Sequence, residues 1–179
     1  MDLRRGMQKP EPFHKSGILL KAAGYWNLAS GREEKYRRSG MYIADLHIHS
    51  RFSRATSKEG DPQHLELWAA RKGIRMVGTG DFTHPAWRQE LEEKLEPAGG
   101  GLYRLKEEYR LQEWRAAGEE EPLFVVSGEI SSIYKKNGRV RKVHNVILLP
   151  GLEEAGRLSA RLEAIGNIHS DGRPILGLD

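Results

Sequence analysis

The chain has 179 residues, of which 38% are hydrophobic and 30% charged, a composition typical of a globular domain or a piece of one. The absence of cysteine excludes disulfides, Cys-type zinc fingers, iron–sulfur clusters and a thiol nucleophile, so any metal must be held by His and carboxylate side chains. The net charge of +4 comes from the first 40 residues, because residues 41–179 hold 20 of the 29 basic and 21 of the 25 acidic side chains.

No apolar segment is long enough for a membrane protein. A transmembrane helix needs roughly 20 apolar residues, and a secretory signal needs about 7 to 15. The apolar run 143–150 is interrupted by His144 and Asn145, and the N-terminus has no comparable run. We therefore expect a cytoplasmic protein without a membrane partner.

Residues 1–40 are rich in glycine and basic side chains and contain one short apolar stretch, Ile18–Leu20. They predict a basic N-terminal arm. The peptide 37–40 supports a second interpretation, because codons for Arg-Arg-Ser-Gly can spell a purine-rich ribosome-binding site ahead of a true start at Met41. Under that interpretation the start is mis-assigned and residues 1–40 are a translated leader; both interpretations stay open here.

From residue 41 onward, predicted strands alternate with predicted helices. Apolar runs predict strands over residues 41–48, 74–79 and 123–127, and a hairpin over residues 130–149 around the turn Asn137-Gly138. Amphipathic spacing predicts helices over residues 61–73, 87–95, 105–117 and 152–165. This alternation predicts an α/β fold with a largely parallel sheet, in which reactive side chains collect at the carboxyl ends of the strands.

Side chains that can bind metal follow these predicted strands. His47 and His49 lie two positions apart near the end of the first strand, so their imidazoles project from the same face. Asp45 precedes them and can orient an imidazole by a hydrogen bond. Four further candidate ligands follow the later strands: Asp81, His84, Glu129 and His144. Such a site suits zinc, manganese or iron, and two or more ions commonly serve phosphate-ester hydrolysis.

The segment 45–50, Asp-Leu-His-Ile-His-Ser, resembles the first motif of the polymerase and histidinol phosphatase (PHP) superfamily of metal-dependent phosphoesterases. Four further stretches resemble endonuclease Q within that superfamily, in the right order along residues 41–179. They are residues 44–57, 78–85 (Gly-Thr-Gly-Asp-Phe-Thr-His-Pro), 127–131 with 142–145, and 170–174 (Ser-Asp-Gly-Arg-Pro). Residues 1–40 match nothing in that group.

The resemblance implies a PHP-type distorted (β/α)7 barrel, of which residues 41–179 form the N-terminal part, and two or three divalent ions in the complete enzyme. It implies an endonuclease that nicks damaged DNA, duplex or single-stranded, on the 5′ side of hypoxanthine or uracil, or at abasic sites, in repair. His47, His49, Glu129 and His144 match metal-ligand positions. Asp81 is favoured as a further ligand, with His84 as the competing candidate.

Two departures from the family pattern predict a chain that is incomplete as an enzyme. Residues 51–58 offer no additional His or Asp ligand, and the expected Asp-x-His motif of the last strands is absent. That motif supplies ligands and the residue expected to help activate water, so no catalytic side chain is assigned. The alternatives are a PHP phosphatase acting on a small phosphate monoester, and an inactive fragment that binds metal or DNA.

A cluster of basic residues surrounds the predicted hairpin turn. Its members are Lys135, Lys136, Arg139, Arg141 and Lys142. One interpretation is a basic finger that contacts DNA phosphates, which would give salt-dependent affinity without sequence preference. The other is a solvated tip whose lysines block edge-to-edge strand pairing. Trp87, beside the 81–84 loop, is the tryptophan expected to stack on a flipped base.

Overall fold

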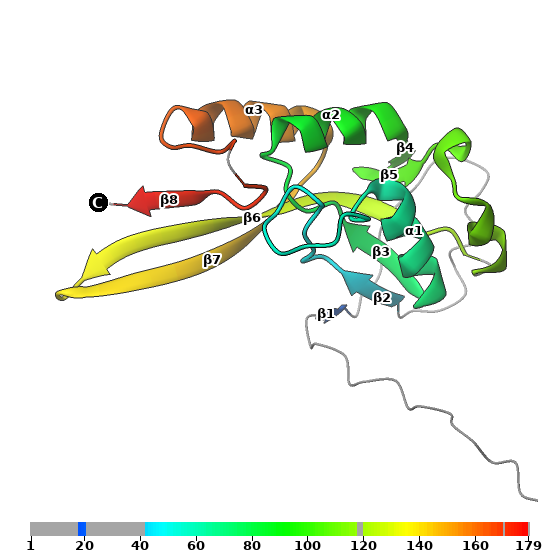
Figure 1. The fold of residues 1–179 in the computed structure, drawn as a ribbon, viewed down its shortest axis with the longest axis horizontal. Coiled ribbons are helices and arrows are strands. Elements are labelled where there is room, and N and C mark those ends of the chain that lie inside the picture. Colours follow the sequence, from blue (N-terminus) through cyan, green and yellow to red (C-terminus); the bar gives the residue numbers. More distant parts are fainter. Residues whose placement is uncertain (1–17, 21–41, 118–119, 170, 179) are drawn as a thin grey trace, which may run out of the picture.

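The computed structural model describes residues 18–20, 42–117, 120–169 and 171–178. Apart from β1 (Ile18–Leu20), the predicted N-terminal arm and the alternative start at Met41 lie outside the described residues. The fold is mixed α/β, with helices on one side of an eight-stranded sheet (Figure 1). In this part of the chain, none of the helices has the length and apolar character needed to cross a bilayer.

Three parallel strands form the part of the sheet that carries the candidate ligands. They are β2 (Tyr42–Asp45), β3 (Ile74–Gly78) and the first half of β6 (Leu123–Lys136). β1 pairs with β2 in the antiparallel sense, and an antiparallel hairpin of β4 (Leu95–Gly99) and β5 (Leu102–Leu105) continues the sheet on the other side of β6. The strand order is β1-β2-β3-β6-β5-β4.

The second half of β6 extends beyond this part of the sheet. There it pairs antiparallel with β7 (Arg139–Leu149) and parallel with β8 (Ile175–Leu178). The predicted hairpin is confirmed, with Lys136 opposite Arg139 across the Asn137-Gly138 turn. β6 and β7 form a long arm that projects from the body of the molecule, with β8 alongside β6 over residues 131–134 (Figure 1).

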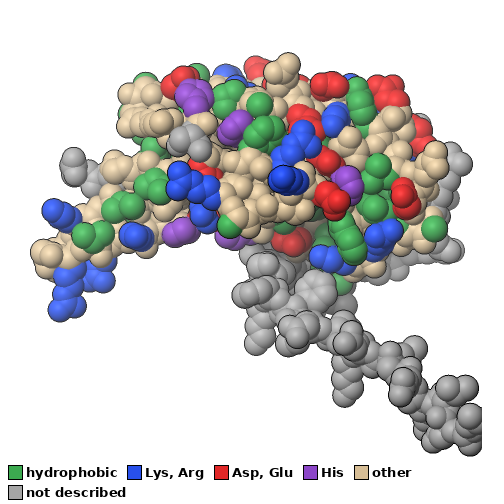
Figure 2. Space-filling view, in the orientation of Figure 1, with side chains coloured by type: hydrophobic (Ala, Val, Ile, Leu, Met, Phe, Trp, Pro, Cys, Tyr) green, Lys and Arg blue, Asp and Glu red, His purple; other side chains and the backbone are tan. Residues whose placement is uncertain are grey.

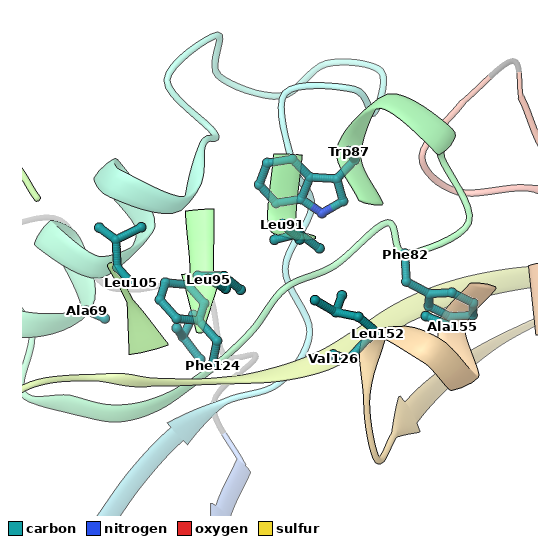
Figure 3. Close-up of a cluster of buried hydrophobic side chains, with 11 residues drawn as sticks. Ala69, Phe82, Trp87, Leu91, Leu95, Leu105, Phe124, Val126, Leu152 and Ala155 are labelled. Carbon is teal, nitrogen blue, oxygen red and sulfur yellow. The ribbon is translucent and has the colours of Figure 1, made fainter. Parts of the chain in front are cut away.

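The main helices are α1 (Pro62–Arg71), α2 (Pro85–Lys94) and α3 (Leu152–Glu163). α1 begins where predicted, because the Asp61 carboxylate accepts a hydrogen bond from the His64 main-chain N–H and Pro62 occupies the first turn. α2 and α3 contact each other over the same face of β6. Figure 3 shows the core beneath them, where Phe124 and Val126 of β6 meet Leu91, Leu95 and Leu152.

Two expectations about the fold were wrong, and one strand was not expected. The sheet is mixed rather than largely parallel: four of the seven strand pairings among the described residues are antiparallel, β1–β2, β4–β5, β5–β6 and β6–β7, and three are parallel, β2–β3, β3–β6 and β6–β8. Residues 123–136 form one continuous strand where two were expected. β8 was not expected, because its four residues carry only a short apolar signal.

The predicted helix over residues 105–117 is also absent. Leu105 ends β5 instead, and two short 3-10 segments follow, Glu107–Tyr109 and Gln112–Ala116. Arg110 explains the difference, because its guanidinium binds the buried Glu66 carboxylate of α1 at 2.9 Å and stacks over Trp114. These contacts hold the segment against α1 in place of a regular helix. The sheet is open over the described residues, so the barrel implied by the resemblance is not seen.

Candidate metal centre

His47 and His49 lie in the segment that follows β2, directly beside the segment that follows β3. The two segments approach closely because Gly80 has no side chain. A Cβ at Gly80 would lie 2.5 Å from the Ile48 carbonyl oxygen, and its backbone φ of +65° is one that glycine adopts without strain. The glycine therefore lets Asp81 reach the imidazole of His49.

Three of the predicted ligands converge on one point. Donor atoms of His47, His49 and Glu129 all lie within 4.8 Å of one another. Oε2 of Glu129 lies 2.7 Å from Nε2 of His47 and 3.4 Å from Nε2 of His49. Glu129 is buried in the middle of β6, whereas the His47 side chain is 38% exposed, so the group is open to solvent on the histidine side.

His144 supplies a fourth donor from the neighbouring strand β7. It stands opposite Ser131 across the β6–β7 ladder, and its Nδ1 contacts Oε1 of Glu129. Burial acts to raise the pKa of Glu129, but the hydrogen bonds with His47 and His144 outweigh it and the pKa lies below its usual value. The Glu129 carboxylate is therefore ionised at neutral pH.

Asp81 is completely buried and contacts His49 on the side of the ring away from Glu129. Its Oδ1 lies 3.0 Å from Nδ1 of His49. Its Oδ2 accepts hydrogen bonds from the Ser50 main-chain N–H and hydroxyl, both at 2.7 Å, and from the Ser53 hydroxyl at 3.0 Å. Both carboxylate oxygens are thus engaged, and a hydrogen bond at Nδ1 leaves Nε2 of His49 facing Glu129.

The contact between His49 and Asp81 shifts both pKa values. The hydrogen bond to Asp81 raises the pKa of His49, although burial opposes this shift. Burial acts to raise the pKa of Asp81, but the hydrogen bonds from His49 and Ser50 outweigh it, so the pKa lies below its usual value. The pair is a charge-assisted hydrogen bond within a buried setting.

His84 and Asp45 lie apart from this group. His84 precedes α2, and its ring stacks on Phe52 with 4.4 Å between centroids. Its Nδ1 is buried with no hydrogen-bond partner among the described residues, and burial lowers its pKa. Oδ1 of Asp45 is also buried and unpartnered there, and burial raises the pKa of that carboxyl. The orienting contact anticipated for Asp45 is made by Asp81.

The donor set fits a divalent cation. Two imidazole nitrogens and one carboxylate converge, with a third imidazole, that of His144, on the other oxygen of Glu129, and such a combination suits zinc, manganese or iron. One of these histidines, His49, is oriented by a hydrogen bond with Asp81, a residue outside the converging donors.

The basic hairpin residues lie at the far end of the β6–β7 arm. All five side chains are exposed, and Figure 2 shows Lys and Arg gathered at that end of the molecule. Lys142 is two residues before His144 on β7, so the arm connects the basic tip to the histidine cluster.

Trp87 does not fit the expected stacking role. Its side chain is fully buried in the core, as Figure 3 shows, and its indole N–H donates hydrogen bonds to the carbonyl oxygens of Thr79 and Gly80. The ring is therefore part of the packing beneath α2 and is inaccessible to a base.

Sequence reasoning did not assign roles to Ser50, Ser53, Gly172 or Arg173. The two serines hold Asp81, while Gly172 packs against Asp81 and Arg173 lies near Glu129. The sequence signal that could have found these four residues is their position within the stretches 44–57 and 170–174 that resemble endonuclease Q.

No known protein-family profile matches the sequence. The chain is 30% identical over 131 residues to an uncharacterized protein of Methanocaldococcus jannaschii, MJ0043, a match that covers 73% of this chain and 13% of that protein. The shared region is thus a small part of the longer relative.

Two solved structures are similar in fold and sequence. One is the lesion-specific endonuclease PfuEndoQ of Pyrococcus furiosus, with a TM-score of 0.58, and the other is endonuclease Q bound to a 27-mer duplex with an abasic lesion at its active site, with a TM-score of 0.59. Each is 28% identical, and each match covers 75% of this chain and 29% of the other. The described chain is therefore similar in structure to part of endonuclease Q.

Proposed function

We propose that this chain corresponds to the N-terminal part of a PHP-superfamily, metal-dependent DNA endonuclease of the endonuclease Q type. The observation that carries the proposal is the convergence of His47, His49 and Glu129 in a fold similar to that of a lesion-specific endonuclease. A bound divalent ion supplies Lewis-acid assistance to hydrolysis of a phosphodiester.

In this proposal the ligands are His47, His49, Glu129 and His144, and the ion is zinc, manganese or iron. Asp81 orients His49 through the 3.0 Å contact with Nδ1. The substrate is DNA that carries hypoxanthine, uracil or an abasic site, nicked on the 5′ side of the lesion. The complete enzyme would hold two or three ions, with the further ligands outside residues 41–179.

The exposed basic hairpin supports a nucleic-acid substrate over a small phosphate monoester. Lys135, Lys136, Arg139, Arg141 and Lys142 form a charged surface that extends well beyond the space a small substrate needs. Because such a surface can neutralise several phosphates at once, it favours a polyanionic substrate over one with a single phosphate.

Metal analysis of the purified chain is the first test, followed by cleavage assays. We expect at least one zinc, manganese or iron ion per chain by mass spectrometry, lost in the double variant His47→Ala/His49→Ala. The metal-loaded chain is then offered labelled duplexes with uracil, hypoxanthine or an abasic site and, separately, p-nitrophenyl phosphate. Nicking of the damaged duplexes supports the proposal.

The other outcomes favour the alternatives. Hydrolysis of the small ester alone would identify a phosphatase. Metal and DNA binding without cleavage of either substrate would identify a non-catalytic binding fragment, in line with the 29% of the endonuclease Q chain that the match covers. A chain without bound metal would contradict the proposed centre.

A further inference from the structure

Arg173 is held beside the metal centre by the chain between α3 and β8. The preceding Gly172 packs so closely that a Cβ there would lie 2.4 Å from Cγ and Oδ2 of Asp81. The Gly172 N–H donates to the Phe52 carbonyl oxygen at 3.2 Å, and the Pro174 carbonyl oxygen accepts from the Ser131 N–H at 3.0 Å. The backbone on both sides of Arg173 is therefore fixed.

The Arg173 side chain points toward Glu129 without a hydrogen bond to it. Nε lies 3.9 Å from Oε1 of Glu129, a separation of an ion pair that is beyond hydrogen-bond distance. Across the described parts of the chain, no side-chain hydrogen bond from Arg173 is found, and the side chain is 37% exposed. A guanidinium carries five N–H donors, and none of them is engaged in a hydrogen bond with the described residues.

Neutralising Glu129 is a weak explanation for this arginine. The Glu129 carboxylate already contacts His47 and His144, and an ion bound by the same side chains would engage it further. A divalent ion on three neutral imidazoles and one carboxylate has a net charge of about +1. Arg173 adds a second positive charge beside Glu129, and together they would form a site for an anion.

We propose that Arg173 binds the phosphate group of the substrate next to the metal centre, through paired N–H donors on its non-bridging oxygens. This inference rests on the proposed function, and it names the residue that positions the phosphate. Arginine suits the role because its planar fork matches phosphate oxygens in a bidentate contact. The contact differs from that of the hairpin tip, since it acts on one phosphate beside the metal ligands.

The test measures phosphate binding directly on the full chain loaded with Mn²⁺. Inorganic phosphate is titrated while its ³¹P relaxation, which a nearby Mn²⁺ accelerates, reports the bound fraction. For Arg173→Gln we expect binding at least tenfold weaker than in the wild type, with the Mn²⁺ content unchanged. Arg173→Lys keeps the charge without the fork and should fall between the two.

Arg157→Gln is the matched control, because it removes the same charge from α3, where Arg157 is 66% exposed and pairs with Glu154. It should leave phosphate binding unchanged. A short single-stranded DNA, which offers internal phosphodiesters, should displace phosphate from the wild type. Failure of DNA to compete would overturn the assignment to a phosphodiester and leave a free-phosphate site.

The outcomes separate the two proposals. Equal phosphate affinity in Arg173→Gln and Arg157→Gln, with Mn²⁺ retained, overturns the role of Arg173 and leaves the metal centre standing. If both Arg173→Gln and Arg173→Lys lose Mn²⁺ while the circular-dichroism spectrum stays that of the folded chain, Arg173 is a structural partner of Glu129. This outcome also overturns the phosphate-binding role. If the wild-type chain binds no Mn²⁺, zinc or iron, the proposed function and this inference are both wrong.

Discussion

Oδ1 of Asp81 lies 3.0 Å from Nδ1 of His49, and this contact turns the opposite nitrogen of the ring toward Glu129. The two residues follow different strands, and Asp81 is itself held by Ser50 and Ser53. The orientation of the imidazole thus depends on a buried group that is outside the set of converging donors.

Asp81→Asn should weaken metal binding about 10- to 100-fold, because the amide carries no negative charge for His49 and its NH2 group cannot accept the hydrogen bonds from Ser50 and Ser53. Competition with a chelator gives the affinity. Asp61→Asn is the control, since Asp61 makes a comparable 2.8 Å contact with His64 at the start of α1. Equal affinities in the two variants would contradict an orienting role for Asp81.

Glu129→Gln should abolish stable metal binding while the chain stays folded. The substitution keeps the shape of the side chain, but it removes the negative charge at the point where His47, His49 and His144 meet. Metal per chain after dialysis measures the effect. The control, Glu163→Gln, removes the exposed partner of His169 and should not change metal content; a normal metal content in Glu129→Gln would refute the ligand assignment.

The stability of the metal-free chain should depend on pH through His49 and Asp81. The pKa of His49 is raised above 6.5, so its contribution is complete below about pH 6.5 and is lost as pH rises through the raised value. The pKa of Asp81 is lowered below 3.8, so its contribution is present above that pH and is lost as pH falls through the lowered value.

Urea unfolding of the metal-free wild type and of His49→Gln, across acidic to mildly alkaline pH, measures this dependence. The difference in the free energy of unfolding should be largest between the two pKa values and should shrink toward alkaline pH. A difference that stays constant over the whole range would show that the pair does not titrate as described.

Gly172→Ala should destabilise the chain by about 1–3 kcal/mol, because the added methyl group meets Asp81 and Ser53. It should also lower metal affinity, since Asp81 must move. Gly177→Ala is the control, because a Cβ at Gly177 has no atom within 4 Å. Thermal unfolding and chelator competition check both effects, and equal behaviour of the two variants would argue against close packing at Asp81.

The double variant Lys135→Gln/Lys136→Gln should reduce the salt dependence of DNA binding. If both lysines contact phosphates, the slope of log affinity against log salt falls by up to about 2. Arg157→Gln/Arg161→Gln removes two charges from α3 and should leave the slope unchanged. If the lysines only block strand pairing, the slope stays the same and the variant aggregates instead.

The sequence predicted the elements whose signals are local. The N-cap Asp61 with Pro62 located the start of α1, and Asn137-Gly138 located the hairpin turn. The β4–β5 hairpin and the segment after it were missed, because they depend on Leu105 packing in the core and on Arg110 binding Glu66. Tertiary contacts of this kind leave no periodic pattern in the chain.

The candidate site shows the same division. His47, His49, Glu129 and His144 could be named from residue type and their places after or within predicted strands; in the structure His47, His49 and Glu129 converge and His144 contacts Glu129. Sequence alone left Asp81 and His84 as competing ligands, because loop geometry decides which side chain reaches the cluster. The burial of Trp87 could not be predicted from the sequence either, because a tryptophan next to a loop has the same sequence context whether it faces solvent or the core.

β6 is shared by both parts of the sheet, and His47 lies 82 residues from its partner Glu129 on that strand. The donors can meet only after β2, β3 and β6 have paired in register, which requires closing long loops early in folding. An ion recognises the finished arrangement, so we expect its binding energy to be absent from the folding transition state. Metal should therefore slow unfolding of the chain much more than it speeds folding.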